Sequence, residues 1–135
     1  FGIDTVTYVE EALKKLQETV TPSKIIFVSD DLQWCEENLS HLNSVAPCIF
    51  EKQGSGMFDD LALVASAPYL ILTNTTFGYW GAYIGELLTQ KIVFSPDIHQ
   101  LLPKDAHIYQ RRPKMHRTHW VAVHHPEGKN WITGE

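Results

Sequence analysis

Apolar residues along most of the chain alternate between two kinds of spacing. From Asp4 to about Val20 they recur at helical intervals, which predicts an amphipathic helix with a buried stripe of Tyr8, Val9, Ala12, Leu13 and Leu16. Asp4 or Thr5 can cap the start of this helix, and Thr21-Pro22-Ser23 can end it. The chain is therefore expected to open with a helix.

The next apolar run, at residues 25–28, is continuous rather than periodic. A continuous run is typical of a strand buried on both faces, as in a parallel sheet. Similar runs predict further strands at 46–50, 69–73 and 91–94, and helical spacing between the runs predicts helices at 32–39, 57–66 and 77–88. The repeated order of helix and strand predicts an α/β fold, a Rossmann-like parallel sheet with helices on both faces.

This alternation stops at Ser95. The residues beyond it are polar, contain several histidines and prolines, and show no sustained period. We therefore expect a Rossmann-like domain at residues 1–96 and an irregular C-terminal extension at residues 97–135. The sequence begins at Phe1 rather than Met, so we also expect it to be a piece of a longer protein, whose compartment cannot be deduced from this terminus.

Composition narrows the classes of protein. A chain of 135 residues with 44% hydrophobic and 20% charged residues is an ordinary globular domain. The net charge of -5, with lysines and arginines dispersed, argues against nucleic-acid binding, which needs a basic surface. No apolar run approaches the length of a membrane span.

The two cysteines, Cys35 and Cys48, lack metal-ligand spacing and are expected to be small buried residues. A disulfide between them is an open alternative that requires a secretory compartment. Asn38-Leu39-Ser40 and Asn74-Thr75-Thr76 match the glycosylation tripeptide, which is common by chance and matters only in such a compartment.

Three clusters of polar residues come after predicted strands, and ligands bind at the strand ends in open parallel sheets. These clusters are Ser29-Asp30-Asp31, the stretch 54–60 and the stretch 73–76. The last opens a helix, whose N–H groups and dipole favour an anion such as phosphate, and its hydroxyls add donors. Alternatively, Thr75 or Thr76 simply caps the helix, which is compatible with phosphate binding.

Carboxylates at the other strand ends suit a nucleoside. A carboxylate can accept hydrogen bonds from guanine or from ribose hydroxyls, and the candidates are Asp30, Asp31, Asp59 and Asp60. The alternative for each is a favourable interaction with a helix N-terminus. The sequence lacks a Gly-rich dinucleotide motif, a P-loop, and the Asp-x-Asp pattern by which many nucleotide-sugar enzymes hold a metal.

The C-terminal histidines are weak metal candidates. Pro113 and the β-branched residues around them disfavour a helix, and no carboxylate accompanies them in sequence. We therefore expect surface histidines at 116, 119, 124 and 125. Tryptophans are expected mainly in the core rather than as platforms for sugars, and Trp120 is the one for which a ligand role is most open.

Two longer motifs resemble those of a known family. Residues 59–63 (DDLAL) and 69–83 (YLILTNTTFGYWGAY) resemble the C-terminal motif of the α1,2-fucosyltransferase family. Phe27-Val28-Ser29-Asp30-Asp31 followed by Trp34 resembles its middle motif. The resemblance covers about residues 4–96, with weaker similarity to nematode-type members at Leu102-Pro103-Lys104-Asp105 and Trp120.

The resemblance implies that residues 1–96 are the GDP-sugar-binding half of a GT-B glycosyltransferase. Such enzymes transfer fucose from GDP-fucose to the 2-hydroxyl of a galactose-containing glycan, with inversion and without a required metal. It also implies a glycoprotein of the Golgi lumen, part of a type II membrane protein anchored by a preceding segment. By the same resemblance Asp60 contacts guanine, Ser29 and Asp30 lie near the nucleoside, and the pyrophosphate is held by Thr75, Thr76 and Phe77.

The sequence departs from the family in one respect. The family's His-x-Arg-Arg-x-Asp motif is absent, and Arg111-Arg112 stands in a different order and context. No residue stands out as a general base, so we expect this chain alone to bind nucleotide weakly and to catalyse nothing.

The competing hypothesis is a non-catalytic nucleotide-binding or receiver-like domain of flavodoxin type. It would use Asp30-Asp31 as its acidic pair and Thr73 as its strand-end threonine. A receiver domain also needs a third aspartate at a strand end and a lysine after its last strand. This sequence lacks that aspartate, and Lys91 precedes its strand rather than following it.

Overall fold

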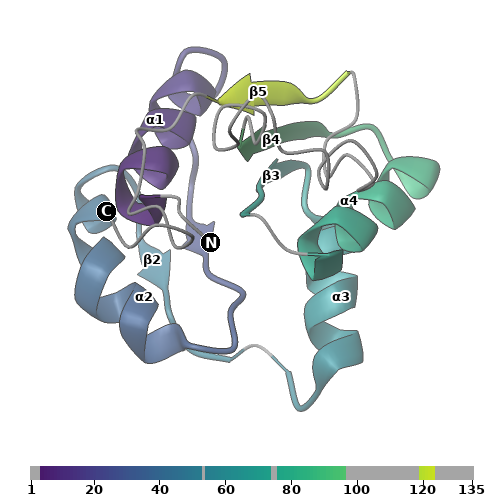
Figure 1. The fold of residues 1–135 in the computed structure, drawn as a ribbon, viewed down its shortest axis with the longest axis horizontal. Coiled ribbons are helices and arrows are strands. Elements are labelled where there is room, and N and C mark those ends of the chain that lie inside the picture. The colour runs from purple at the N-terminus through teal and green to yellow at the C-terminus, as the bar shows by residue number, and fades with distance from the viewer. Residues whose placement is uncertain (1–3, 53, 74–75, 97–118, 124–135) are drawn as a thin grey trace, which may run out of the picture.

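The computed structural model describes residues 4–52, 54–73, 76–96 and 119–123. Helices and strands alternate along them (Figure 1): α1 (Thr5–Gln17), β1 (Ile25–Ile26), α2 (Leu32–Leu39), the 3-10 helix η1 (Ser40–Ser44), β2 (Cys48–Ile49), α3 (Met57–Ser66), β3 (Tyr69–Ile71), α4 (Thr76–Leu88), β4 (Ile92–Pro96) and β5 (Val121–Val123). None of the helices described is long and apolar enough to cross a membrane.

The described strands pair in two groups, and every pairing is parallel. β1 pairs with β2, while β4 lies between β3 and β5. Pairing continues past the end of β3, because the amide of Leu72 donates to the carbonyl of Phe94 at 2.8 Å. The predicted α/β, Rossmann-like fold is therefore confirmed.

Local sequence explains where the first helix begins and ends. Asp4 caps α1 by accepting hydrogen bonds from the amide of Thr7 at 3.1 Å and from its hydroxyl at 2.7 Å. The helix ends at Gln17, earlier than predicted, after a last turn that carries Lys14 and Lys15 next to the negative end of the helix dipole. Helices α2 and α3 begin and end where the apolar spacing predicted.

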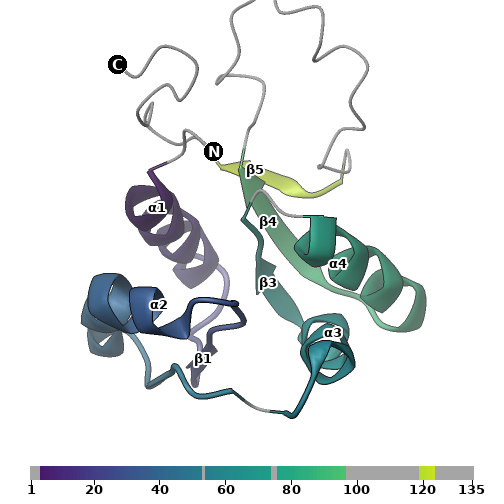
Figure 2. The same cartoon turned by 60° about the horizontal axis from the view of Figure 1, so that its bottom comes forward.

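Two apolar clusters cover opposite faces of the β3–β4–β5 sheet. α1 lies on one side of these strands and α4 on the other (Figure 2). The first cluster packs the predicted stripe of α1 against Leu39, Leu42, Phe94 and Val123. It also includes half-buried residues of the β1–β2 side, such as Phe27 and Phe50, whose rings stack with centroids 4.6 Å apart. The first cluster therefore joins both groups of strands to α1.

The second cluster lies under α3 and α4, and its buried members are Val64, Leu70, Leu72, Ala82, Val93 and Trp120. Glycine lets the two helices approach closely. A Cβ built on Gly81 would lie 2.6 Å from a methyl of Val64, and one built on Gly85 would lie 2.4 Å from the carbonyl oxygen of Ala65. The α3–α4 pair is thus packed too tightly at these points for any side chain.

The sheet continues past residue 96, which the sequence pattern did not predict. Val121 of β5 pairs with Phe94 of β4, and Lys15 of α1 donates to the carbonyl of Ala122 at 3.3 Å. A strand of three residues is too short to show a period, and its partner is distant in sequence. The other residues of the predicted irregular extension lie outside the described ranges, apart from His119 and Trp120.

Candidate functional site

The candidate site is the edge at which the parallel strands end. Ser29-Asp30-Asp31 follows β1, and Thr73 follows β3. Val28, just before the first group, packs against the second apolar cluster together with Leu72 of the β3 end. The ends of β1 and β3 therefore converge, although the two strands belong to different hydrogen-bonded groups.

The two aspartates after β1, Asp30 and Asp31, have different roles. The carboxylate of Asp31 caps α2 by accepting from the amide of Trp34 at 3.0 Å, and the amide of Asp31 donates to the hydroxyl of Ser29 at 3.0 Å. Asp30 is exposed and takes no part in either bond. Asp31 therefore serves the N-terminus of a helix, the alternative to ligand binding, whereas Asp30 can reach a ligand.

The two aspartates at the start of α3 divide in the same way. Asp59 accepts from the amide of Ser55 at 2.9 Å and from its hydroxyl at 3.3 Å, which closes the turn that leads into α3. Among the residues the structure describes, the half-buried carboxylate of Asp60 has no hydrogen-bond or ion-pair partner. Of the two, Asp60 is the one available to a ligand.

The third predicted cluster opens α4. Thr75 lies outside the described residues, and α4 begins at Thr76, of which the backbone alone is described. The ring of Phe77 packs against the second apolar cluster, so this residue can offer a ligand its backbone N–H in the first helical turn but not its side chain. α4 thus begins shortly after the end of β3, as the sequence predicted, while the hydroxyls of Thr75 and Thr76 lie outside what the structure describes.

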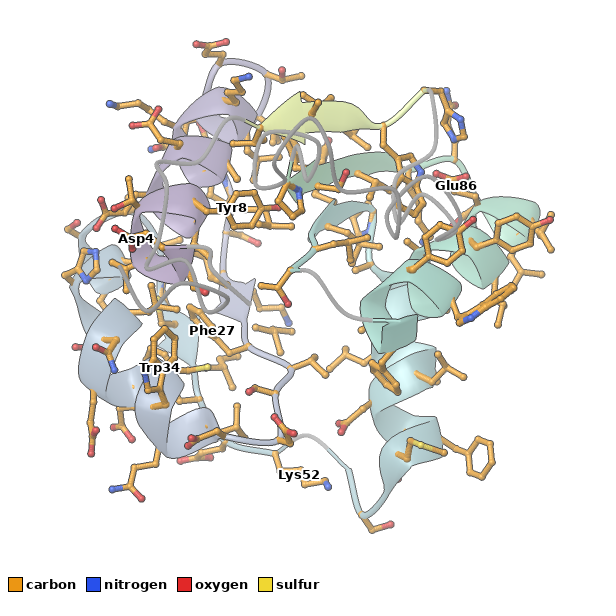
Figure 3. All side chains as sticks on the ribbon, in the orientation of Figure 1. Asp4, Tyr8, Phe27, Trp34, Lys52 and Glu86 are labelled. Carbon is orange, nitrogen blue, oxygen red and sulfur yellow. The ribbon has the colours of Figure 1, made fainter. Side chains whose placement is uncertain are left out.

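Tyr8 contributes to this edge, although the sequence indicated only a core role for it. Its side chain is fully buried and points from α1 toward the strands (Figure 3). Its hydroxyl donates to the carbonyl of Leu72, and the carbonyl of Phe94 lies 3.4 Å away. Burial raises the pKa of Tyr8 well above its ordinary value, so the hydroxyl stays protonated and remains a donor.

Comparison with known proteins identifies the family. The model of glycosyl transferase family 11 matches residues 3–121, which include all these strand-end clusters. The chain belongs to glycosyl transferase family 11. The family-level resemblance noted in the sequence is thereby confirmed.

Curated family 11 relatives align with part of this chain. An α1,2-colitosyltransferase of Escherichia coli is 26% identical over 83 residues, 62% of this chain and 29% of that protein. Galactoside α-(1,2)-fucosyltransferase 1 of Saimiri sciureus is 27% identical over 57% of this chain and 21% of its own length. Galactoside α-(1,2)-fucosyltransferase 2 of Mus musculus is 29% identical over 57% of this chain and 22% of its own. The chain thus matches less than a third of each relative, and no solved structure matches it significantly.

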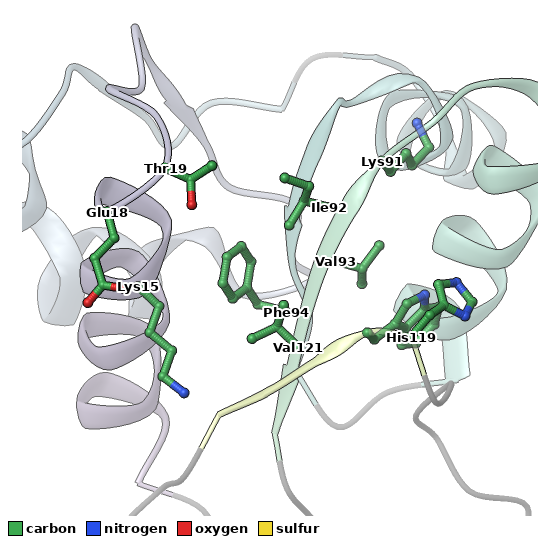
Figure 4. Close-up of a pocket in the computed structure, with 10 residues that line it drawn as sticks. Lys15, Glu18, Thr19, Lys91, Ile92, Val93, Phe94, His119 and Val121 are labelled. Atoms are coloured by element: carbon green, nitrogen blue, oxygen red, sulfur yellow. The ribbon is translucent and has the colours of Figure 1, made fainter.

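The family 11 chain also has an open pocket of about 530 Å³ near the opposite ends of the strands (Figure 4). The C-terminal end of α1, the first residues of β4 and the residues that lead into β5 line it. Its basic side chains already have partners: Lys15 donates to the carbonyl of Ala122, Lys91 to that of Ala67 at 2.7 Å, and the ring of His119 bonds to Glu86. We therefore place the candidate site at the strand-end edge instead.

His119 has a carboxylate partner that the sequence order concealed. Its Nε2 lies 2.9 Å from a carboxylate oxygen of Glu86 on α4, and the indole N–H of Trp120 donates to the other oxygen. No carboxylate lies near the histidines in sequence, and this contact joins residues 33 apart. His119 is exposed, as predicted. Among the described residues no group of three or more possible metal ligands occurs.

Both cysteines are free thiols in this fold. Cys35 is buried and Cys48 is half-buried. The prediction that both are small buried residues therefore holds fully for Cys35 and in part for Cys48. Burial raises the pKa of each thiol, which lowers the thiolate fraction and hence the reactivity at neutral pH. Neither cysteine is therefore a candidate nucleophile.

Proposed function

We propose that this family 11 chain is the donor-binding part of an α1,2-fucosyltransferase of GT-B type, and that it binds GDP-fucose. The observation that carries the proposal is the convergence of the ends of β1 and β3, with the exposed Asp30 after β1 and the start of α4 after β3. On α3, Asp60 adds a carboxylate that has no partner among the described residues. Carboxylates for a nucleoside and a helix N-terminus for phosphate are the two kinds of group that a nucleotide sugar needs.

The names of the curated relatives support the type of linkage more than the sugar. They describe α1,2 transfer in each case, with colitose as the sugar in one and fucose in the others. We propose fucose as the sugar and the 2-hydroxyl of a galactoside as the acceptor, in line with the larger group. The receiver-like alternative loses its support because the chain belongs to a glycosyltransferase family.

Each candidate residue has a proposed role in donor binding. The carboxylate of Asp60 accepts hydrogen bonds from N1–H and the amino group of guanine, and Ser29 and Asp30 interact with the ribose. The pyrophosphate lies at the start of α4, where the hydroxyls of Thr75 and Thr76 and the amide of Phe77 donate to its oxygens. Asp31 and Asp59 maintain the turns that present these groups.

Charge development explains what these groups contribute to the reaction. The galactose 2-hydroxyl attacks the anomeric carbon from the face opposite GDP, a new C–O bond forms as the bond to phosphate breaks, and the configuration inverts. Negative charge grows on the leaving GDP, and fixed donors at the helix start stabilise it in place of a metal ion. The arginine motif of the family and the base that takes the hydroxyl proton are not found in this chain, which we propose does not turn over alone. In the cell we place it in the Golgi lumen, within a type II membrane protein.

The first test measures nucleotide binding to this chain by calorimetry, with and without EDTA. We expect GDP to bind more tightly than UDP or ADP, equally well in EDTA, and about tenfold more weakly to the Thr75→Ala, Thr76→Ala variant, since two donors to an anion are lost. Thr21→Ala, an exposed threonine after α1, is the matched control and should bind as the wild type does. Preference for UDP or ADP would refute the assignment.

The acidic pair after β1 provides a second test, because the two roles predict opposite effects. Asp31→Ala should lower the free energy of unfolding by about 1 kcal/mol through loss of the α2 cap. Asp30→Ala should leave stability unchanged and weaken GDP binding about tenfold. Chemical denaturation and calorimetry on both variants measure the two effects, and full GDP affinity in Asp30→Ala would remove that residue from the site.

A further inference from the structure

We propose that the exposed face of α4 is a dimerisation surface, on which a second copy of this chain packs its own α4 around a two-fold axis. This surface, the outer stripe of α4, consists of Trp80, Ile84, Leu87 and Leu88. The inference goes beyond the proposed function and does not depend on nucleotide binding.

α4 carries apolar residues on two different sides. Its inner side, with Gly81, Ala82 and Gly85, is buried against α3 and the second apolar cluster. Successive residues turn by about 100° around a helix, which places the outer stripe within one arc on the other side. There Trp80 is 54% exposed and Leu87 is 72% exposed. A helix that is apolar all round is normally buried, and the 13 residues of α4 are too few to cross a membrane, so its outer stripe suits burial by protein.

The outer stripe has no charged residue, unlike the outer sides of the helices across the sheet. α1 presents Glu10 and Lys14 to solvent, and α2 presents Glu36. Glu86 is the one charged residue of α4, and its carboxylate bonds to the ring of His119. Because the chain carries a net charge of -5, two copies approach at the least electrostatic cost where the surface is uncharged. The stripe also lacks the basic residues with which helices bind anionic membranes.

The spacing of the outer stripe fits a helix as its partner. Trp80, Ile84 and Leu87 are separated by four and three residues, the intervals at which apolar side chains interlock between two packed helices. In an antiparallel pair of α4 helices centred on Ile84, Trp80 of each copy lies against Leu87 of the other. A bulky ring then faces a smaller side chain on both sides of the axis. The surface is therefore complementary to itself, which favours a second copy over an unrelated partner.

The bulky end of the stripe is held in place by other rings. The ring of Trp80 meets those of Tyr79 and Tyr83 edge to face, with centroids 5.4 Å and 5.7 Å apart. Tyr79 in turn contacts the buried ring of Trp120, with centroids 5.5 Å apart. A tryptophan held in this way loses little side-chain freedom when a partner binds, and tryptophan is common among the residues that contribute most to interface energy. Trp80 is therefore the expected anchor of the dimer.

The test is sedimentation velocity of this chain from micromolar to near-millimolar concentration, with Leu87→Lys and Gln33→Lys as matched variants. We expect the wild type to pass from monomer to dimer as its concentration rises. Leu87→Lys places a charge in the interface from each copy and should weaken dimerisation about a hundredfold or more. Gln33→Lys adds the same charge at an exposed position of α2, on the far side from α4 (Figure 1), and should dimerise as the wild type does.

A monomer at every concentration would overturn the inference and favour a different occupant of the outer stripe, such as another part of a longer family 11 protein. A dimer that survives Leu87→Lys would overturn it too, because the contact would then lie elsewhere, and so would polydisperse aggregates in place of a dimer. If Leu87→Lys fails to fold, the wild type decides: methyl resonances of Ile84 and Leu87 that shift with concentration support the inference, and constant resonances overturn it.

Discussion

Gly85→Ala is expected to lower the free energy of unfolding by about 3 kcal/mol, although it adds a single methyl group. The new Cβ would lie 2.4 Å from the carbonyl oxygen and 2.9 Å from the Cα of Ala65, which are backbone atoms of α3. It would also lie 2.3 Å from Cε of Lys91, but a lysine side chain can move aside. The backbone contact can be relieved only by separating the two helices. Urea denaturation of the variant and the wild type measures the effect.

The matched control is Gly56→Ala at the N-cap of α3. Its Cβ would meet nothing within 4 Å, and its backbone is extended, a conformation open to any residue. A change within about 0.5 kcal/mol is expected there. If the two substitutions lower the free energy of unfolding equally, the effect of Gly85→Ala comes from backbone entropy or helix propensity rather than from close helix packing.

Trp120→Ala is expected to be the most damaging single substitution, with a loss of about 3–5 kcal/mol. The side chain is 4% exposed, packs into the second apolar cluster and donates its indole N–H to Glu86. Its removal leaves a cavity between β4 and α4 and breaks the link to the helix. A loss of this size is a large part of the stability of a small domain, so thermal unfolding by circular dichroism should shift strongly.

Trp34→Ala serves as the comparison, since this tryptophan is 38% exposed on the first turn of α2. We expect it to cost about 1 kcal/mol or less. If both substitutions cost the same, Trp120 is not the core residue that its burial indicates. The sequence predicted core tryptophans in general, and the structure bears this out for Trp120 but less for Trp34 and Trp80, both of which are exposed.

Residue patterns predicted the helices of this fold well because their apolar stripes are regular. The run from Met57 to Ser66 carries an apolar face over its whole length, and α3 has these bounds. Strand ends were less predictable: the apolar run at 25–28 became a two-residue β1, while β4 extended to Pro96. The number of paired residues depends on the neighbouring strand, which no local pattern contains.

The candidate site could be located from sequence but not resolved into roles. Strand-end reasoning pointed to the acidic pairs, yet within each pair both residues have the same chemistry. Hydrogen bonds separate them in the structure: Asp31 and Asp59 hold local turns, and Asp30 and Asp60 do not. The contact of Tyr8 with Leu72 joins residues 64 apart, and no one-dimensional pattern reveals it.

The position of β5 has a consequence for how the protein is made. α1 is synthesised before β5, yet its apolar face is completed by Val123, and Lys15 bonds to a carbonyl 107 residues later. At ribosomal speed the interval between these segments is on the order of ten seconds. During that time the tyrosine and leucines of α1 have only part of their final covering, so the nascent chain presents them to chaperones or to other nascent chains. The apolar face of α1 is thus protected from aggregation only after β5 has been synthesised and has paired.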